Sequence, residues 1–273
     1  MDLALTKLLD RIPSDRIRIT VVTGAGISAE SGIPTFRGEE GYWTVGSREY
    51  HPQEMATLQT YQSLPRELWH WYLYRRGICR AASPNAAHIA LARLGKALGR
   101  RLQVITQNVD GLHLRAGQDP ALTYEVHGNI DHMRCSEACR AEIHLLPVDL
   151  LCPSRSARLS DQEFKRLRCP RCGAAARPHI LWFDECYDET LYRADSAIRA
   201  AATCDLFITI GTSGAAALPM HATAEAANAG AAIVDINPMD NPFATFARES
   251  AHGHWARSSA GTLVPEIADH LLA

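Results

Sequence analysis

Two close pairs of cysteines are the clearest chemical signal in the chain, which contains eight cysteines in all. Cys135 and Cys139 are separated by three residues, and Cys169 and Cys172 by two. Four thiolates that converge on one point make a tetrahedral zinc site, and two close pairs are a usual way to assemble one. Because four thiolates leave no open position for water or substrate, we predict a structural zinc ion. Cys152 lies between the pairs and could replace one ligand, although it has no close partner.

Residues 24–29 (GAGISA) form a glycine-rich segment directly after the apolar stretch Ile17–Val22. Glycines let the backbone turn sharply and approach a pyrophosphate, and the N–H groups of a helix start bind anions. The segment can also be an ordinary strand-to-helix turn, and the strand before it favours phosphate binding. A dehydrogenase would place an acid after a second strand about 20 residues on, whereas residues 31–38 (SGIPTFRG) continue as a loop. Residues 211–214 (GTSG) follow another predicted strand and are a second candidate phosphate contact.

Polar residues follow the predicted strand Leu102–Ile105, within residues 106–113 (TQNVDGLH). Ligands of open α/β sheets collect at the carboxyl ends of strands, so Asn108 and Asp110 could hold an amide or a water there. Asp110 could also simply cap a helix. His127 ends a short strand-like run, and histidine suits general-base chemistry near neutral pH. The chain has twelve histidines, so residue chemistry alone does not select this one.

These loops require a sheet that brings strand ends together. The predicted strands are Ile17–Val22, Leu102–Ile105, Ile180–Phe183, Asp205–Ile210 and Ala231–Ile236. The predicted helices are Leu64–Arg76, Ala86–Leu98, Leu191–Ala202, Ala217–Ala227 and a final helix from about Val264 to Leu272. Continuous apolar strands that alternate with helices indicate a mostly parallel sheet covered on both faces. We therefore predict a doubly wound α/β fold.

Two stretches interrupt this alternation and predict a second, smaller domain. Residues 38–80 contain an aromatic-rich loop and helix, and residues 129–178 carry five of the eight cysteines. We expect these stretches to form an inserted helical and zinc-binding domain. Residues 1–37, 81–128 and 179–273 would form the large domain, with a ligand cleft between the two.

The composition of the chain is balanced in charge. Twenty-eight basic and 30 acidic side chains give a formal net charge of −2, which predicts neither a nucleic-acid nor a membrane partner. The start of the sequence lacks the basic and apolar regions of a secretory signal, and no apolar run approaches the roughly 20 residues of a membrane helix. We expect a cytoplasmic protein, where thiols stay reduced.

Taken together, these segments resemble the sirtuin family. The resemblance covers residues 24–34, residues 106–113, His127 with Gly128, the paired cysteines and residues 211–213, in the family's order. It implies a Rossmann-like large domain, a small zinc-binding and helical domain, and NAD bound between them as a co-substrate. It also implies that acyl-lysine proteins are the substrates.

The resemblance assigns roles to individual residues. The residues that it implies for NAD binding are Gly24, Ala25, Gly26, Ala29, Ile33, Phe36, Arg37, Gln107, Asn108, Asp110, Gly211, Thr212, Ser213, Asn237 and Ala260. Among these, Ile33, Asn108 and Asp110 would line the nicotinamide pocket. Gln107 and Asn237 would contact ribose, residues 211–213 the phosphates, and Ala260 the adenine. Asn237-Pro238 departs from the family, in which an acid often follows that asparagine at short range.

The implied mechanism uses no protein nucleophile. The acyl carbonyl oxygen attacks the sugar carbon of NAD as nicotinamide leaves, and His127 is the general base for a ribose hydroxyl. The products are nicotinamide, free lysine and O-acyl-ADP-ribose. Residues 179–185 (HILWFDE) resemble the strand that pairs with the substrate backbone, which would place Trp182 and Phe183 at the substrate. Asp184 departs from the family, in which many members have glycine.

A further resemblance concerns the acyl group. Tyr72 and Arg75 share one helix face and resemble the Tyr-x-x-Arg motif of the desuccinylase branch, although such a pair is usually just part of a polar helix face. Ala56 resembles the small residue that enlarges that branch's acyl pocket, and Thr35 replaces an aspartate of many deacetylases. An arginine and a tyrosine can bind a carboxylate together, so we expect succinyl and malonyl groups to be preferred over acetyl.

Three other functions fit the same scaffold. A protein ADP-ribosyltransferase would pass the sugar to a side chain, an NAD glycohydrolase would pass it to water, and an NAD-sensing module would catalyse nothing. His127 and the substrate-strand motif favour deacylation over all three.

Overall fold

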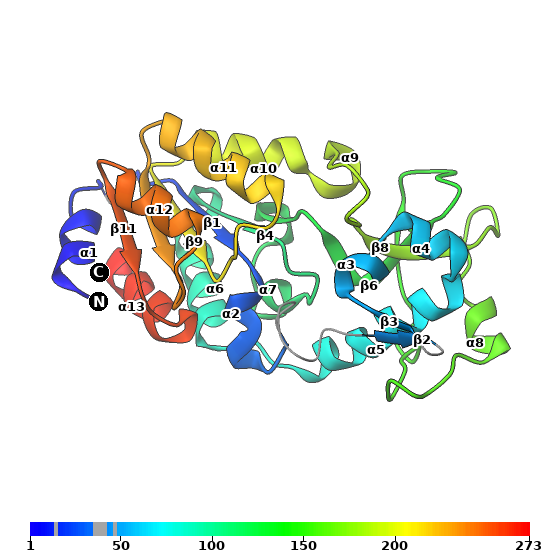
Figure 1. Ribbon diagram of the computed structural model, residues 1–273. Helices are drawn as coiled ribbons and strands as arrows, with labels where there is room; N and C mark the ends of the chain where they lie inside the picture. The colour runs from blue at the N-terminus through cyan, green and yellow to red at the C-terminus, as the bar shows by residue number, and fades with distance from the viewer. Residues whose placement is uncertain (14–15, 35–42, 46–47) are drawn as a thin grey trace.

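The computed structural model describes residues 1–13, 16–34, 43–45 and 48–273 (Figure 1). Thr35, Phe36 and Arg37 lie outside the described residues, so the roles predicted for them stay predictions.

A six-stranded sheet, parallel in every pairing, forms the larger part of the molecule. Its strands, in spatial order, are β11 (Gly253–Ala256), β10 (Ala232–Ile236), β9 (Leu206–Ile210), β1 (Ile19–Thr23), β4 (Leu102–Thr106) and β5 (Thr123–Glu125). Every residue of β1, β9 and β10 is buried, as expected of strands covered on both faces. The predicted doubly wound α/β fold is confirmed.

The order of the strands marks the place in the sheet where a ligand is expected to bind. The chain passes from β1 to β4 and β5 on one side and later returns to the other side of β1 for β9, β10 and β11. The direction of winding therefore reverses between β1 and β9. In open α/β sheets, ligands bind at the carboxyl ends of the strands at such a reversal.

Helices cover both faces of this sheet (Figure 1). The helices on one face are α1 (Leu3–Leu9), α6 (Ala86–Leu98) and α13 (Ala260–Leu272), and those on the other are α10 (Ala194–Ala202), α11 (Ala217–Asn228) and α12 (Pro242–Glu249). Helices α10 and α11 turn mainly alanines toward the sheet, which permits close packing. Asn85 begins α6 by accepting hydrogen bonds from the N–H groups of Ala87 and His88.

The smaller part of the molecule has a core of its own. Its sheets are β7 (Ile143–Leu145), β6 (Gly128–Cys135) and β8 (Ala176–Ile180), all antiparallel, and the hairpin β2 (Trp43–Val45) and β3 (Arg48–Tyr50). Its helices are α3 (Pro52–Met55), α4 (Leu58–Ser63), α5 (Pro65–Ala81) and α8 (Asp161–Lys165). A hydrophobic cluster that is separate from those on the two faces of the large sheet, and that includes Trp69 and Trp182, fills this part. The separate cluster supports the two-domain division, which stays a prediction.

A buried arginine fastens α5 to the rest of the small part. Arg76 is 1% exposed and its Nε lies 2.6 Å from an Asp131 carboxylate oxygen of β6. The same guanidinium donates to the carbonyls of Pro147 and Leu150 at 2.8 Å. A buried charge is tolerated when it is paired and hydrogen-bonded in this way, so Arg76 has a structural role.

Several predicted elements differ from the observed ones. The predicted strand Ile180–Phe183 is wrong, because β8 ends at Ile180 and belongs to the small antiparallel sheet. The predicted helix Leu191–Ala202 is interrupted at Arg193, whose φ of 53° breaks it into α9 (Glu189–Tyr192) and α10. Helix α5 extends to Ala81, and α13 begins earlier than predicted, at Ala260. Among the helices of the described residues, none has the length and apolar character needed to cross a membrane.

Candidate active site

The two glycine loops pack against each other at the carboxyl ends of β1 and β9. The N–H of Gly26 donates to the carbonyl of Gly211 at 2.8 Å, and the N–H of Gly24 to the carbonyl of Ile210 at 3.0 Å. A Cβ at Gly24 would lie 2.7 Å from Thr212 Cα, and one at Gly26 would lie 2.6 Å from Gly211 Cα. These positions therefore require glycine for the loops to meet, and two amide groups expected to face phosphate are used within the protein.

Short helices continue from the first loop. Ala25 begins α2 (Ala25–Ser28), and Ala29 begins the 3₁₀ helix η1 (Ala29–Ser31). The carboxylate of Glu30 in η1 accepts a hydrogen bond from the N–H of Gly261 at 3.0 Å. This bond brings the start of α13, where Ala260 is buried, beside the glycine loop. Residues from the two ends of the sequence thus meet at this edge of the sheet.

Thr212 links three of the loops. The side-chain amide of Gln107, after β4, donates to Thr212 Oγ1 at 2.8 Å. The amide of Asn237, after β10, donates to the Thr212 carbonyl at 2.9 Å. Ser213 is exposed next to this link. The structure therefore brings together residues that the sequence predicts for ribose and phosphate.

A second polar group surrounds Ser28. Its hydroxyl donates to the Asp110 carboxylate at 2.7 Å and lies 3.1 Å from the side-chain nitrogen of Asn108. Asn108 also donates to the carbonyl of Gly24 at 3.0 Å. All three side chains are buried, while nearby Ile33 belongs to the core of the small part. The residues predicted for nicotinamide therefore lie together, where the two parts adjoin.

His127 lies between β5 and β6. Its Nδ1 is 3.1 Å from the Gln107 carbonyl, and its Nε2 is 2.7 Å from the hydroxyl of Tyr187. Because a carbonyl oxygen only accepts, Nδ1 carries the hydrogen and the neutral ring keeps its lone pair on Nε2. Burial lowers the pKa of His127 to about 4. The imidazole is therefore neutral at physiological pH and can accept a proton at Nε2.

The residues predicted for the acyl-lysine substrate adjoin one another. The indole N–H of Trp182 donates to the Tyr72 hydroxyl at 2.9 Å, and the N–H of Phe183 donates to the Ala56 carbonyl at 3.0 Å. Trp182 is 1% exposed and Phe183 is 63% exposed. The guanidinium of Arg75 lies 5.3 Å from the centre of the Trp71 ring, which contacts Tyr72. One exposed apolar side chain thus lies beside a buried Tyr–Trp pair.

Residues 181–185 form a turn that a buried ion pair holds in place. The Arg177 guanidinium lies 3.5 Å from the centre of the Trp182 ring and binds both carboxylate oxygens of Glu185. Glu185 also accepts from the Trp182 N–H at 3.1 Å. Asp184, the departure from the family pattern, accepts the N–H of Leu58 at 2.8 Å at the start of α4. Its carboxylate therefore fastens the turn to α4, which a glycine could not do.

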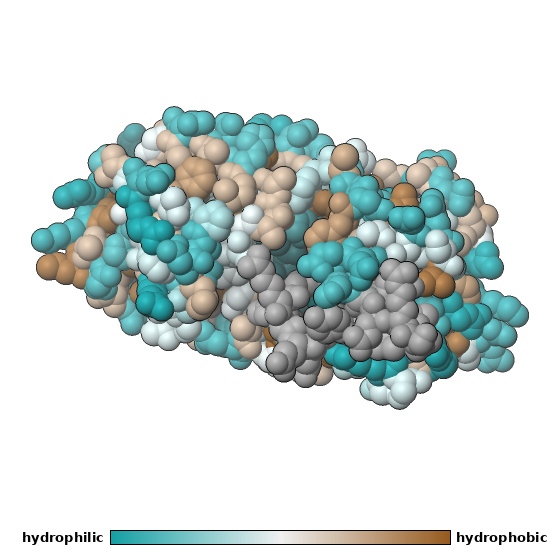
Figure 2. Space-filling model, viewed as in Figure 1, coloured by the Kyte–Doolittle hydropathy of each residue, from teal (hydrophilic) through white to brown (hydrophobic). Residues whose placement is uncertain are grey.

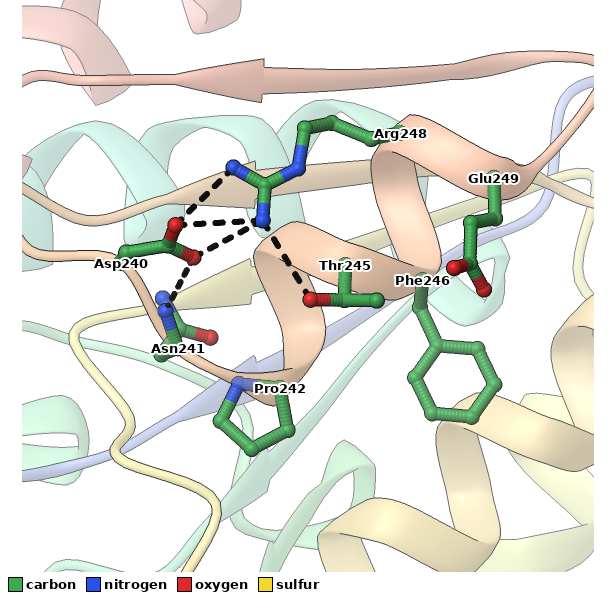
Figure 3. A pocket seen from close by; sticks show the side chains of 7 residues that line it. All are labelled: Asp240, Asn241, Pro242, Thr245, Phe246, Arg248 and Glu249. Atoms are coloured by element: carbon green, nitrogen blue, oxygen red, sulfur yellow. Dashed lines mark hydrogen bonds and ion pairs between the residues drawn. The ribbon is translucent and has the colours of Figure 1, made fainter.

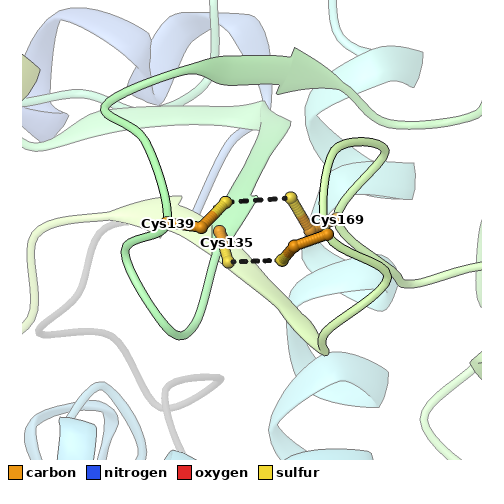
Figure 4. A group of neighbouring side chains, drawn as sticks. Cys135, Cys139 and Cys169 are labelled. Atoms are coloured by element: carbon orange, nitrogen blue, oxygen red, sulfur yellow. Dashed lines mark hydrogen bonds between the residues drawn. The ribbon is translucent and has the colours of Figure 1, made fainter.

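The four predicted cysteine ligands converge (Figure 4). Their sulfurs all lie within 4.8 Å of one another, with Cys135 and Cys172 3.6 Å apart and Cys139 and Cys169 3.7 Å apart. Thiolates about 2.3 Å from a zinc ion at tetrahedral angles lie about 3.8 Å from one another. The cluster therefore fits a structural zinc ion, as predicted. Cys152 is not part of it and is buried in the core of the small part.

Comparison with known families places this site in context. A family model described as the Sir2 family matches residues 24–217. The chain belongs to the Sir2 family. It is 35% identical over 257 residues to an NAD-dependent protein deacylase of Leptospira interrogans, covering 93% of each chain.

Solved Sir2 structures share the fold. A Sir2 homologue in complex with NAD has a TM-score of 0.76 and 32% identity, covering 100% of this chain and 94% of that one. A mutant Sir2 homologue in complex with 2′-O-acetyl-ADP-ribose has a TM-score of 0.77 and 32% identity, covering 100% and 97%. In the Sir2 chain described here, the surface is hollowed where the larger and smaller parts adjoin (Figure 2).

The sequence analysis predicts no individual role for three residues that lie in or beside this site. Ser28 bridges Asn108 and Asp110, and its place inside the glycine motif was the available signal. Thr23 lies 2.9 Å from both the Thr106 hydroxyl and His113 Nε2, and so joins β1 to β4 beneath the loops. Tyr187, which contacts the proposed base, lies two residues after the motif at 179–185 and has no signal of its own.

A separate surface pocket of about 550 Å³ lies on α12 (Figure 3). The residues that line it are Asp240, Asn241, Pro242, Thr245, Phe246, Arg248 and Glu249. The carboxylate of Asp240 pairs with Arg248, whose guanidinium also lies 4.9 Å from the centre of the Trp255 ring. None of the predicted site residues lines this pocket, and its Asp240 and Arg248 are paired with each other.

Proposed function

We propose that this Sir2 protein is an NAD-dependent protein lysine deacylase. The observation that carries the proposal is His127, a neutral imidazole with its lone pair on Nε2. The loop after β4 that supplies its carbonyl partner is bonded to the loop after β9. The deacylase names of relatives such as the Leptospira protein support the activity, and the NAD complex of a Sir2 homologue supports the co-substrate.

The residues near the carboxyl ends of β1 and β9, where the direction of winding reverses, fit a dinucleotide. The glycine loops, residues 24–29 and 211–213, lie at the strand ends, where a pyrophosphate binds in open α/β sheets. Gln107, Asn237 and Ala260 would contact the ribose and adenine groups. Asn108, Asp110 and Ile33 would hold the carboxamide in a dry pocket and so orient the bond that breaks. Bound NAD supplies the sugar carbon that accepts the acyl oxygen as nicotinamide leaves.

His127 then supplies the acid–base chemistry. Its Nε2 would take a proton from a ribose hydroxyl, and the Gln107 carbonyl would stabilise the Nδ1–H of the imidazolium that forms. The exposed Phe183 would contact the protein segment that carries the acyl-lysine. The contact would involve the turn at residues 181–185. It would not use a strand of the six-stranded sheet.

We further propose that acidic acyl groups, succinyl and malonyl, are preferred over acetyl. An indole N–H only donates, so Tyr72 accepts from Trp182 and keeps its own hydrogen to donate. Burial raises the pKa of Tyr72, which keeps the phenol protonated. Arg75, one turn further along α5, would add the positive charge, and the small side chain of Ala56 would leave room. Initial rates on succinyl-, malonyl- and acetyl-lysine peptides test this preference.

The nucleotide product distinguishes the proposal from its rivals. We expect incubation with NAD and an acyl-lysine peptide to yield O-acyl-ADP-ribose, detected by mass spectrometry. An ADP-ribosyltransferase would yield ADP-ribosylated protein, and a glycohydrolase would yield ADP-ribose with an unchanged peptide. An NAD sensor would yield no product. Any of these three results would overturn the deacylase assignment. The cytoplasmic location stays a prediction.

A further inference from the structure

Tyr187 contacts the nitrogen that the reaction needs. Its hydroxyl lies 2.7 Å from His127 Nε2, and the two rings are 5.8 Å apart and tilted by 32°. The Gln107 carbonyl fixes the hydrogen on Nδ1, so Nε2 can only accept and Tyr187 must donate. The hydroxyl of Tyr187 therefore occupies the lone pair that would take a proton from substrate.

The surroundings hold Tyr187 in this position. It lies in the loop between β8 and α9, half-buried against the hydrophobic cluster on one face of the six-stranded sheet. The next residue, Asp188, accepts the N–H of Leu191 at 2.7 Å and so begins α9. Burial raises the pKa of Tyr187 to about 12, so the phenol keeps its hydrogen at physiological pH.

The charged groups near His127 are engaged elsewhere. Glu125, two residues before it on β5, accepts from the Asn129 amide at 2.7 Å. Asp110, from the loop after β4, accepts from Ser28. Neither carboxylate is a cause of the lowered pKa of His127, which burial produces against the opposing effect of the Gln107 carbonyl. Among the described residues, Tyr187 is the titratable group bonded to the ring.

We propose that Tyr187 is a positioning residue for the general base. Its hydroxyl holds the His127 ring in the tautomer with its lone pair on Nε2, and gives up that bond when a ribose hydroxyl arrives. This inference rests on the proposed role of His127 as the base. It predicts that the free and the substrate-bound enzyme respond differently to loss of the Tyr187 hydroxyl.

The first test is a ¹⁵N NMR spectrum of the histidine rings in the full-length, zinc-loaded protein at about neutral pH. His127→Ala identifies the His127 signals. In Tyr187→Phe, we expect the Nε2 signal to move downfield, because the unprotonated nitrogen no longer accepts a hydrogen bond. Tyr124→Phe is the matched control, since it removes a buried hydroxyl bonded to Gln103 at 3.0 Å, and it should leave the His127 signals in place. An unmoved Nε2 signal in Tyr187→Phe, or a hydrogen on Nε2 in the wild type, would overturn the proposal.

The second test compares the pH profiles of kcat/KM and kcat. A bond donated to the neutral imidazole disfavours its protonation, so its loss should move the acid limb of kcat/KM upward by about half to one pH unit. The acid limb of kcat should not move, because substrate has already displaced Tyr187. Equal movement of both profiles, or of neither, contradicts the displacement. Absence of any deacylation would overturn the proposed function, while the NMR test would still decide the role of Tyr187.

Discussion

Replacing Arg75 with methionine tests the acyl specificity of the proposed deacylase. Methionine keeps much of the apolar stem of arginine and removes the charge. We expect kcat/KM for a succinyl-lysine peptide to fall by about 10- to 100-fold, because a charge-assisted hydrogen bond is worth about 1.5–3 kcal/mol. Deacetylation should change by less than about threefold, because acetyl offers no carboxylate for that bond.

Arg76, the next residue on α5, has a structural role and serves as a comparison for Arg75. Arg76 is buried and paired with Asp131, so its replacement by methionine should cost about 3–5 kcal/mol of folding stability. Arg75 instead lies over the Trp71 ring at 5.3 Å, a contact that a methionine side chain retains in part. Tyr72→Phe is a less direct test of specificity. It leaves the buried N–H of Trp182 without its acceptor, which should cost about 1–3 kcal/mol of folding stability. That loss would affect the reaction with every substrate.

The assay measures initial rates on succinyl-, malonyl- and acetyl-lysine versions of one peptide at saturating NAD. Arg80→Met, at an exposed position of the same helix whose guanidinium lies 3.2 Å from the Asp131 carboxylate, is the control for loss of a positive charge and of an ion pair on α5. Equal losses on acidic and neutral acyl groups in Arg75→Met would mean that Arg75 supports the fold. The proposed preference for acidic acyl groups would then be refuted.

Three other perturbations probe the base, the metal and the pH dependence. His127→Ala should retain folding and NAD binding by calorimetry and lose about 10²- to 10⁴-fold in deacylation rate; near-normal turnover would exclude it as the base. Cys169→Ser should lose zinc and stability in metal analysis and thermal unfolding, whereas Cys152→Ala should keep one zinc ion per chain; zinc loss in the second variant would make Cys152 a ligand. Burial raises the pKa of Glu125 from 4.5 to about 7, so folding stability should fall as the pH rises through this range. Glu125→Gln should therefore raise the free energy of unfolding by about 2–3 kcal/mol at pH 8 and hardly change it at pH 4; equal effects at both values, measured by urea unfolding, would contradict the shift.

The parts of the fold that could be predicted are those in which local pattern and burial agree. Strands β1, β9 and β10 are buried throughout and mostly apolar because helices cover both faces of the sheet, and the sequence pattern predicts each to within two residues. The edge strand β11 was missed, because its half-buried residues include a glycine and a histidine. Residues 181–183 were wrongly predicted as strand. Their apolar character reflects contacts of Trp182 with Arg177 and Tyr72, which are distant in sequence.

In the candidate site, too, features with a local sequence pattern could be predicted and contacts between distant segments could not. The cysteine pairs could be predicted because each pair is local and thiolate chemistry restricts the outcome. The glycines could be located by motif, but the sequence did not indicate that their N–H groups bond to the neighbouring loop. Tyr187 could not be found, because its contact with His127 depends on how the loop after β8 returns to β5. Such a contact is set by tertiary packing and has no local pattern.

The central claim, that deacylation consumes NAD, is tested most directly by following nicotinamide and free-lysine peptide together in one reaction. We expect the two to appear in equal amounts at every time, and neither to appear when NAD or the acylated peptide is omitted. Nicotinamide release that does not depend on the peptide, or deacylation that proceeds without NAD, would contradict the account.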